Sequence, residues 1–197
     1  MRMALHLVEQ QHRQQARKLA EDLAQATESV RHCAGCRHLA VGELCTLCLS
    51  RARDDSQLCV VESPTDLIAI ESSGGYKGRY FVLHGKLSPI DGIGPRQLGF
   101  DKLESMVARS QGREAVGDAA QSTSVDFDTR ISEVILALGT TVEGNVTCRY
   151  LQQRLAPYQL RITRLAQGMP AGGNVDLLDS ITLGQAMHQR VQLDQES

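Results

Sequence analysis

Four cysteines within residues 33–48 form the clearest chemical pattern of the sequence. They stand as two Cys-x-x-Cys pairs, Cys33 with Cys36 and Cys45 with Cys48. Each pair can present two thiolates to one ion from a tight turn, and four thiolates complete the tetrahedral shell that structural zinc prefers. Because no coordination position would stay open, we expect a structural zinc ion that stabilises a four-cysteine zinc finger.

Two other uses of paired cysteines fit this sequence less well. A redox-active site needs a single Cys-x-x-Cys pair and gains nothing from a second. Disulfides are typical of secreted proteins, and residues 1–6 show no apolar segment followed by a cleavage site. No apolar run approaches the roughly 18 residues of a membrane span. We therefore expect a cytoplasmic protein with no membrane contact.

Charge is unevenly distributed along the 197 residues. The net charge is −2, yet residues 1–53 hold eight Lys/Arg and five Asp/Glu, which gives +3 there and −5 for the rest. Residues 144–175 contain no acid and four arginines, Arg149, Arg154, Arg161 and Arg164. These two basic zones suit a polyanion such as DNA, and the arginines are candidate contacts. Ordinary solvated faces would give the same pattern.

The elements expected between these residues alternate between helix and strand. Apolar spacing predicts a helix over 2–30, and Ser63, Pro64 and Asp66 predict a capped helix after a strand at 58–61. Residues 50–57 are expected to be a polar stretch and 110–130 a surface insertion. Further strands are expected at 80–83, 134–138 and 160–165, and further helices at 96–108, 145–156 and 183–191. The order predicts an α/β fold with a mainly parallel sheet and flanking helices.

Three acids are predicted to lie at one edge of this sheet. Glu62 directly follows a strand, and Asp91 and Glu143 stand in segments that follow other strands. The carboxyl ends of parallel strands meet at one edge, where ligands bind. Carboxylate oxygens there would suit Mg²⁺. The alternative is that these acids are solvated or cap helices, above all Glu143 at a helix start.

The sequence resembles the RecR family of bacterial recombination mediators. The segments that carry the resemblance are the four-cysteine stretch 33–48, Cys59-Val-Val-Glu-Ser-Pro-Thr-Asp66, Gly78-Arg-Tyr-Phe-Val-Leu83, Gly85-Lys-Leu-Ser-Pro-Ile-Asp-Gly-Ile-Gly-Pro95, Glu133-Val-Ile-Leu-Ala137, Thr141-Val-Glu-Gly144 and Gly168-Met-Pro-Ala-Gly-Gly173. The match extends to about Arg190. Several independent motifs in the right order make the resemblance specific.

The resemblance implies a domain layout and a function. A helical segment at 1–30 would be what remains of a helix-hairpin-helix region, and the zinc finger at 33–48 would precede a Toprim domain at 57–170. A Walker-B-like segment would occupy 171–197. The family implies DNA repair with RecO and RecF, independent of RecBC, in which recombinase is loaded onto single-stranded DNA. It also implies a homo-oligomer, dimer or tetramer, that surrounds DNA.

Two departures from the family pattern shape our expectations. The glycine-rich hairpin that contacts DNA in the family is absent before residue 1, which predicts weakened binding to single- or double-stranded DNA and incomplete assembly. In addition, Glu143-Gly144-Asn145 replaces the usual Glu-Gly-Glu and removes one acid.

Other residues argue against catalysis. Toprim enzymes need Asp-x-Asp where this sequence has Gly139-Thr140-Thr141. We expect a protein without enzymatic activity whose acidic edge docks a partner, RecO above all. A metal-dependent nuclease or primase-like enzyme and a partner-binding remnant without DNA binding remain the alternatives.

Overall fold

The computed structural model describes residues 13–113, 129–166, 168, 174, 176 and 178–188. The chain divides into two compact units, Met1–Thr163 and Arg164–Ser197. In the first unit the elements are α2 (Arg13–Ser29), β1 (Arg31–His32), β2 (Leu39–Ala40), α3 (Thr46–Leu49), β3 (Asp54–Val61), α4 (Pro64–Ser73), β4 (Gly78–Val82), α5 (Phe100–Ser110), β5 (Glu133–Ala137), α6 (Val142–Leu155), the 3-10 helix η3 (Ala156–Tyr158) and β6 (Arg161–Arg164). The last residue of β6 already lies in the second unit, whose described helix is α7 (Ser180–His188).

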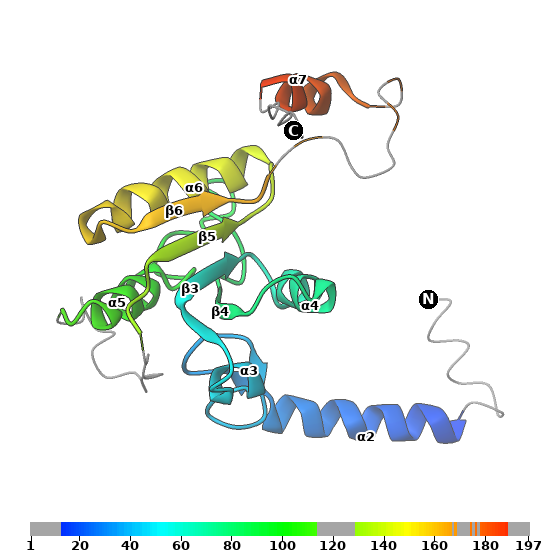
Figure 1. Ribbon diagram of the computed structural model, residues 1–197. Coiled ribbons are helices and arrows are strands. Elements are labelled where there is room, and N and C mark those ends of the chain that lie inside the picture. Colours follow the sequence, from blue (N-terminus) through cyan, green and yellow to red (C-terminus); the bar gives the residue numbers. More distant parts are fainter. Residues whose placement is uncertain are drawn as a thin grey trace, which may run out of the picture. The chain divides into compact units, whose positions relative to one another are not determined.

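A four-stranded sheet in the order β4-β3-β5-β6 organises the first unit (Figure 1). Strand β3 runs parallel to both of its neighbours, and its Val60 lies opposite Phe81 of β4 and Leu136 of β5. The second sheet has two short antiparallel strands, β1 and β2. The predicted α/β class with a parallel sheet and flanking helices is therefore confirmed.

The two faces of β3 belong to two different apolar clusters. Leu58 and Val60 pack with side chains of α5 and α6 in the larger cluster. The alternate residues, Cys59 and Val61, pack with Leu67 of α4 and with the cysteines of residues 33–45. Strand side chains alternate between the two faces of the sheet. Helices α5 and α6 therefore cover one face, whereas α4 and residues 33–48, called here the four-cysteine unit, cover the other (Figure 1).

Helix α4 begins as its sequence predicts. The Ser63 side chain accepts a hydrogen bond from the Asp66 amide, and the Asp66 carboxylate accepts one from the Ser63 amide at 2.9 Å. Pro64 occupies the first turn, where its missing amide proton costs nothing. The predicted capping box is confirmed, and it fixes where the chain turns after β3.

The structure corrects three expected boundaries. Strand β3 starts at Asp54, so part of the expected polar stretch 50–57 is strand. Helix α5 starts at Phe100 and not at residue 96, because the left-handed backbone of Gly99 (φ 71°) interrupts the helix. A Cβ at position 99 would clash with the Arg37 guanidinium, so the position requires glycine. Helix α6 starts at Val142, three residues before the expected start, because Thr141 caps it by accepting from the Gly144 amide.

Some expectations fall partly outside the described residues. Helix α2 covers part of the expected 2–30 helix, and none of its residues is buried. The expected insertion at 110–130 is described only near its ends. In the second unit, Asp179 caps α7 by accepting from the amides of Ile181 (3.0 Å) and Thr182 (2.9 Å). About half of the expected Walker-B-like segment, 171–197, lies outside the described residues.

Candidate metal centre and acidic edge

Short local elements bring the four cysteines together. Cys33 and Cys36 lie in the turn between β1 and β2, Cys45 precedes α3 as its N-cap, and Cys48 lies within α3. The four Sγ atoms all lie within 4.8 Å of one another, and the Sγ atoms of Cys36 and Cys45 are 3.5 Å apart. Bonds of about 2.3 Å in a tetrahedral zinc site would separate the sulfurs by about 3.8 Å. The residues fit one metal ion.

The environment of the sulfurs favours thiolates that bind a metal. The amide of Cys45 donates to Cys33 Sγ at 3.2 Å, and the amide of His38 donates to Cys36 Sγ at 3.4 Å. The hydrogen bond from Cys36 lowers the pKa of Cys33, and the same contact raises the pKa of Cys36. All six cysteines of the chain are free. Cys33 is thus prepared as a thiolate, whereas Cys36 keeps its proton until a cation replaces it.

Backbone and side-chain bonds fasten this four-cysteine unit to the large sheet. The Val82 amide of β4 donates to the Cys36 carbonyl at 2.8 Å. Arg37 donates to the carbonyls of Leu98 and, at 3.2 Å, Gln97, and its guanidinium lies over the Phe81 ring. These contacts tie the turn that holds the first cysteine pair to β4 and to the segment before α5.

A buried ion pair makes a second attachment that the sequence did not indicate. Arg79 of β4 pairs with Asp55 of β3 and donates to the carbonyls of Leu47 (3.2 Å) and Cys48 (2.9 Å). Sequence reasoning missed it because Asp55 stands in a run of polar residues. An alternating pattern through residues 54–57 would have been needed to reveal a strand there.

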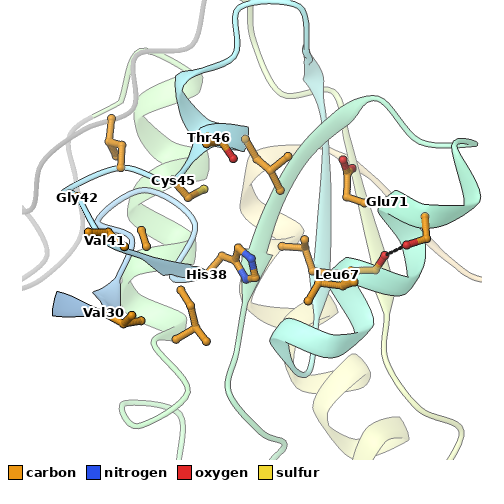
Figure 2. A pocket seen from close by; sticks show the side chains of 14 residues that line it. Val30, His38, Val41, Gly42, Cys45, Thr46, Leu67 and Glu71 are labelled. Atoms are coloured by element: carbon orange, nitrogen blue, oxygen red, sulfur yellow. Dashed lines mark hydrogen bonds between the residues drawn. The ribbon is translucent and has the colours of Figure 1, made fainter. Parts of the chain in front are cut away.

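A cavity of about 720 Å³ lies where the four-cysteine unit meets α4 (Figure 2). Its lining is mainly apolar, and includes Val30, Leu39, Val41, Leu44, Leu67 and Ile68. His38 and Cys45 reach it from the four-cysteine unit, and Glu71 from α4. The Glu71 carboxylate is already engaged by Arg53 and by the Tyr80 hydroxyl at 2.7 Å. The cavity thus offers apolar contact and little free charge.

The three predicted acids lie after the carboxyl ends of three strands. Glu62 directly follows β3, Asp91 lies in the segment after β4, and Glu143 lies in the first turn of α6, after β5. Their side chains contact different partners. Glu62 accepts from the Gly139 amide at 2.6 Å, Asp91 accepts from the Ser88 hydroxyl at 2.6 Å, and Glu143 lies 3.8 Å from Lys86.

These three carboxylates do not form a metal-binding group in the described part of the chain. There, the only set of three or more His, Cys, Asp or Glu side chains with mutually close ligand atoms is the four-cysteine cluster. The pKa of Glu143 is lowered, first by a hydrogen bond from its own amide and then by one from the Thr141 hydroxyl. Glu143 is therefore a partly exposed, ionised group at the start of a helix.

Lys86 is a further residue of this edge that sequence reasoning missed. Its ammonium donates to Thr141 Oγ1 at 3.0 Å and thereby joins the segment after β4 to the start of α6. The next residue, Leu87, donates its amide to Thr147 Oγ1 of α6 at 2.9 Å. The sequence signal was the Gly85-Lys86-Leu87 motif, which is part of a segment that carries the family resemblance.

The four candidate arginines differ in what they contact. Arg154 pairs with Asp101 at 2.8 Å and with Glu104 at 2.5 Å, so its charge serves to join α6 to α5. Arg161 is largely exposed and lies 3.8 Å from Glu133. Arg149 is exposed on α6. Arg164 is exposed and belongs to the second unit.

Two known sequence patterns match this chain. The sequence pattern of the Toprim domain matches residues 56–166, which include the large sheet except the first two residues of β3, and the RecR C-terminal pattern matches residues 168–191. The structure and these matches define a Toprim-domain protein with a four-cysteine metal site.

Curated relatives are named Recombination protein RecR. The chain is 45% identical to the one from Xanthomonas oryzae pv. oryzae (strain MAFF 311018) over 189 residues, which is 96% of this chain and 86% of that protein. It is 44% identical to the one from Hydrogenovibrio crunogenus over the same shares, and 40% identical to the one from Xylella fastidiosa over 98% of this chain and 87% of that protein. The chain belongs to the RecR family. Among the described residues, no helix is long and apolar enough to cross a membrane.

Proposed function

We propose that this protein is a non-enzymatic mediator of recombinational DNA repair. It acts with RecO and RecF, independently of RecBC, and helps to load recombinase onto single-stranded DNA. The observation that carries this proposal is the 45% identity, over 96% of the chain, to a protein named Recombination protein RecR. We further propose that the four cysteines hold zinc, and that the protein works in the cytoplasm as a homo-oligomer.

The end of β5 supports the proposal that the protein is not an enzyme. Toprim enzymes place Asp-x-Asp there to hold metal against phosphate. In this chain the segment is Gly139-Thr140-Thr141, and the Gly139 amide donates a hydrogen bond to Glu62. Glu62 thus orders the backbone at the end of β5, and this role needs no divalent cation.

The acidic edge is our proposed docking surface for RecO. It comprises Glu62, Asp91 and Glu143, which follow the adjacent parallel strands β3, β4 and β5, respectively. The three carboxylates outnumber Lys86, the cation beside Glu143, and a predominantly acidic surface steers and selects a basic partner. We therefore expect the RecO surface that docks here to be basic.

A loading assay tests this function. RecO, recombinase and single-stranded DNA coated with single-strand-binding protein are mixed with and without the purified chain, and recombinase filaments are measured. We expect the chain to accelerate loading, and the Glu143→Lys variant to bind RecO at least tenfold more weakly. The Glu143 side chain is 43% exposed, so loss of its contact with Lys86 and of a negative charge at the helix start should lower thermal stability only slightly.

Matched measurements complete this test. Glu28→Lys, a charge reversal on the exposed helix α2, should leave RecO binding intact. Unchanged loading with and without the chain would contradict the mediator function. Mg²⁺-dependent cleavage or synthesis of DNA by the chain alone would show that it is an enzyme.

A further inference from the structure

Ile90 is the most exposed of the large apolar side chains that the structure describes. Its relative exposure is 96%, compared with 76% for Val142 and 71% for Val41. A single exposed apolar residue on a surface is ordinary and needs no explanation. What distinguishes Ile90 is the way in which the chain holds it and the charges that surround its loop.

Several internal hydrogen bonds hold the loop of residues 88–93. Ser88 and Ile93 exchange two backbone hydrogen bonds, of 3.1 and 2.9 Å, which close the loop at its base. The Ser88 hydroxyl donates to Asp91 at 2.6 Å and accepts from the Asp91 amide at 3.3 Å. Gly92 takes a left-handed conformation (φ 67°) that favours glycine. Ile90 therefore stands at the tip of a loop with an ordered base, and little entropy remains to be lost on binding.

The start of this loop is attached to the acidic edge. Lys86 bonds to Thr141 and lies 3.8 Å from Glu143, while the Leu87 amide bonds to Thr147. Leu87 and Ser88 are both buried, so the base of the loop packs against the body of the unit. The segment that carries Ile90 is thus fixed to the first turns of α6.

Helix α6, to which the segment before the loop is bonded, also exposes apolar side chains. Val142 and Val146, one helical turn apart, are 76% and 50% exposed. They flank Glu143, and Asp91 directly follows Ile90. Apolar side chains and carboxylates therefore alternate along the segments that form this edge.

We propose that Ile90 is the apolar anchor of the docking surface, inserted into an apolar pocket on a partner protein whose rim is basic. This inference rests on the proposed function, and it adds a source of affinity that the carboxylates do not supply. Interfaces gain most of their binding free energy from a few buried apolar or aromatic anchors, whereas exposed charges at the rim mainly set the association rate and specificity. Ile90 and Glu143 should therefore affect different rate constants.

The test measures the kinetics of RecO binding to full-length variants of this chain. For Ile90→Ser we expect a dissociation constant raised at least tenfold, mainly through faster dissociation, with the salt dependence unchanged. Ile90→Leu should retain binding within about threefold, because leucine keeps the apolar volume. For Glu143→Lys we expect slower association and an altered salt dependence. Val41→Ser, on the four-cysteine unit, is the matched control and should bind as the unsubstituted chain does.

The outcomes separate this inference from the proposed function. If Ile90→Ser binds RecO normally while Glu143→Lys does not, docking at the edge stands and the anchor is wrong. An equal loss in Ile90→Ser and Val41→Ser also overturns the anchor, as does a loss of DNA binding by Ile90→Ser with RecO binding intact. If neither Ile90→Ser nor Glu143→Lys affects RecO binding, the proposed docking surface itself fails. Melting temperatures within about 2 °C of the unsubstituted chain would exclude misfolding as the cause.

Discussion

The Arg79 guanidinium lies 2.5 Å from a carboxylate oxygen of Asp55, and the two side chains are only 9% and 4% exposed. The same guanidinium donates to the carbonyls of Leu47 and Cys48. Arg79 thus joins β3, β4 and the last turn of the four-cysteine unit. A buried charge pair with its hydrogen bonds completed in this way couples the metal site to the sheet.

Removing one member of this pair should strongly destabilise the protein. For Arg79→Ala we expect the free energy of unfolding to fall by about 3–5 kcal/mol, because a buried carboxylate is left without its partner. Denaturant titration with the metal bound measures the change. Arg161→Ala, at an exposed arginine, should cost less than about 1 kcal/mol. The double variant Asp55→Leu/Arg79→Met should recover part of the loss, and a stability of Arg79→Ala equal to that of the unsubstituted chain would show that the pair contributes nothing.

Loss of one cysteine ligand should release the metal. We expect the purified protein to hold about one zinc ion per chain, and Cys36→Ser or Cys45→Ser to lose it and to unfold the 33–48 unit. Elemental analysis and far-UV circular dichroism measure the two effects. Cys148→Ser, outside the cluster, should retain the metal. Four titratable thiols and no zinc in the folded, freshly purified protein would contradict this prediction.

Zinc binding should depend on pH. Thiols must lose their protons to bind the metal, so a competition titration should show tighter binding as the pH rises from 6 to 8 and a release of protons on binding. The direction follows from the raised pKa of Cys36, which holds its proton through contact with Cys33 in the metal-free cluster. Affinity that does not change with pH would mean that the cluster binds no metal through its thiolates.

Cys59 should be chemically inert in the folded state. Burial raises the pKa of this thiol from 9.0 to about 12, so at pH 9 the thiolate fraction falls from about one half to about one thousandth. We expect alkylation of Cys59 in the zinc-loaded protein to be at least 100-fold slower than in denaturant, as measured by mass spectrometry. Rapid labelling of Cys59 in the native protein at pH 9 would show that the thiol is accessible.

DNA binding should distinguish Arg149 from Arg154. Arg149 is exposed, so Arg149→Ala should weaken DNA binding and reduce the slope of log affinity against log salt by about 0.7–0.9. Arg154 already pairs with Asp101 and Glu104. Arg154→Ala should therefore lower thermal stability and leave the slope unchanged. A smaller slope for Arg154→Ala at unchanged stability would show that Arg154 contacts phosphate.

The four-cysteine site and the start of α4 could be predicted from the sequence, because the groups that form them are close together in the chain. Thiolates separated by two residues reach one ion from a single turn, and the bonds between Ser63 and Asp66 span three residues. The apolar runs that became β3, β4 and β5 indicated a buried parallel sheet for a similar reason, since a strand covered on both faces needs apolar side chains on both. In each case the groups that carry the signal lie close together in the chain.

Tertiary contacts alone decided the other features. Asp55 is buried because Arg79, 24 residues later, reaches it, and position 99 requires glycine because Arg37 fills the space that a Cβ would take. The carboxylates of Glu62, Asp91 and Glu143 share an edge, yet each is held by a different neighbour, and Arg154 is engaged by acids of α5. Charge and polarity in a sequence show which groups need a partner. Only the packing of distant segments determines whether that partner is water, another side chain or a second protein.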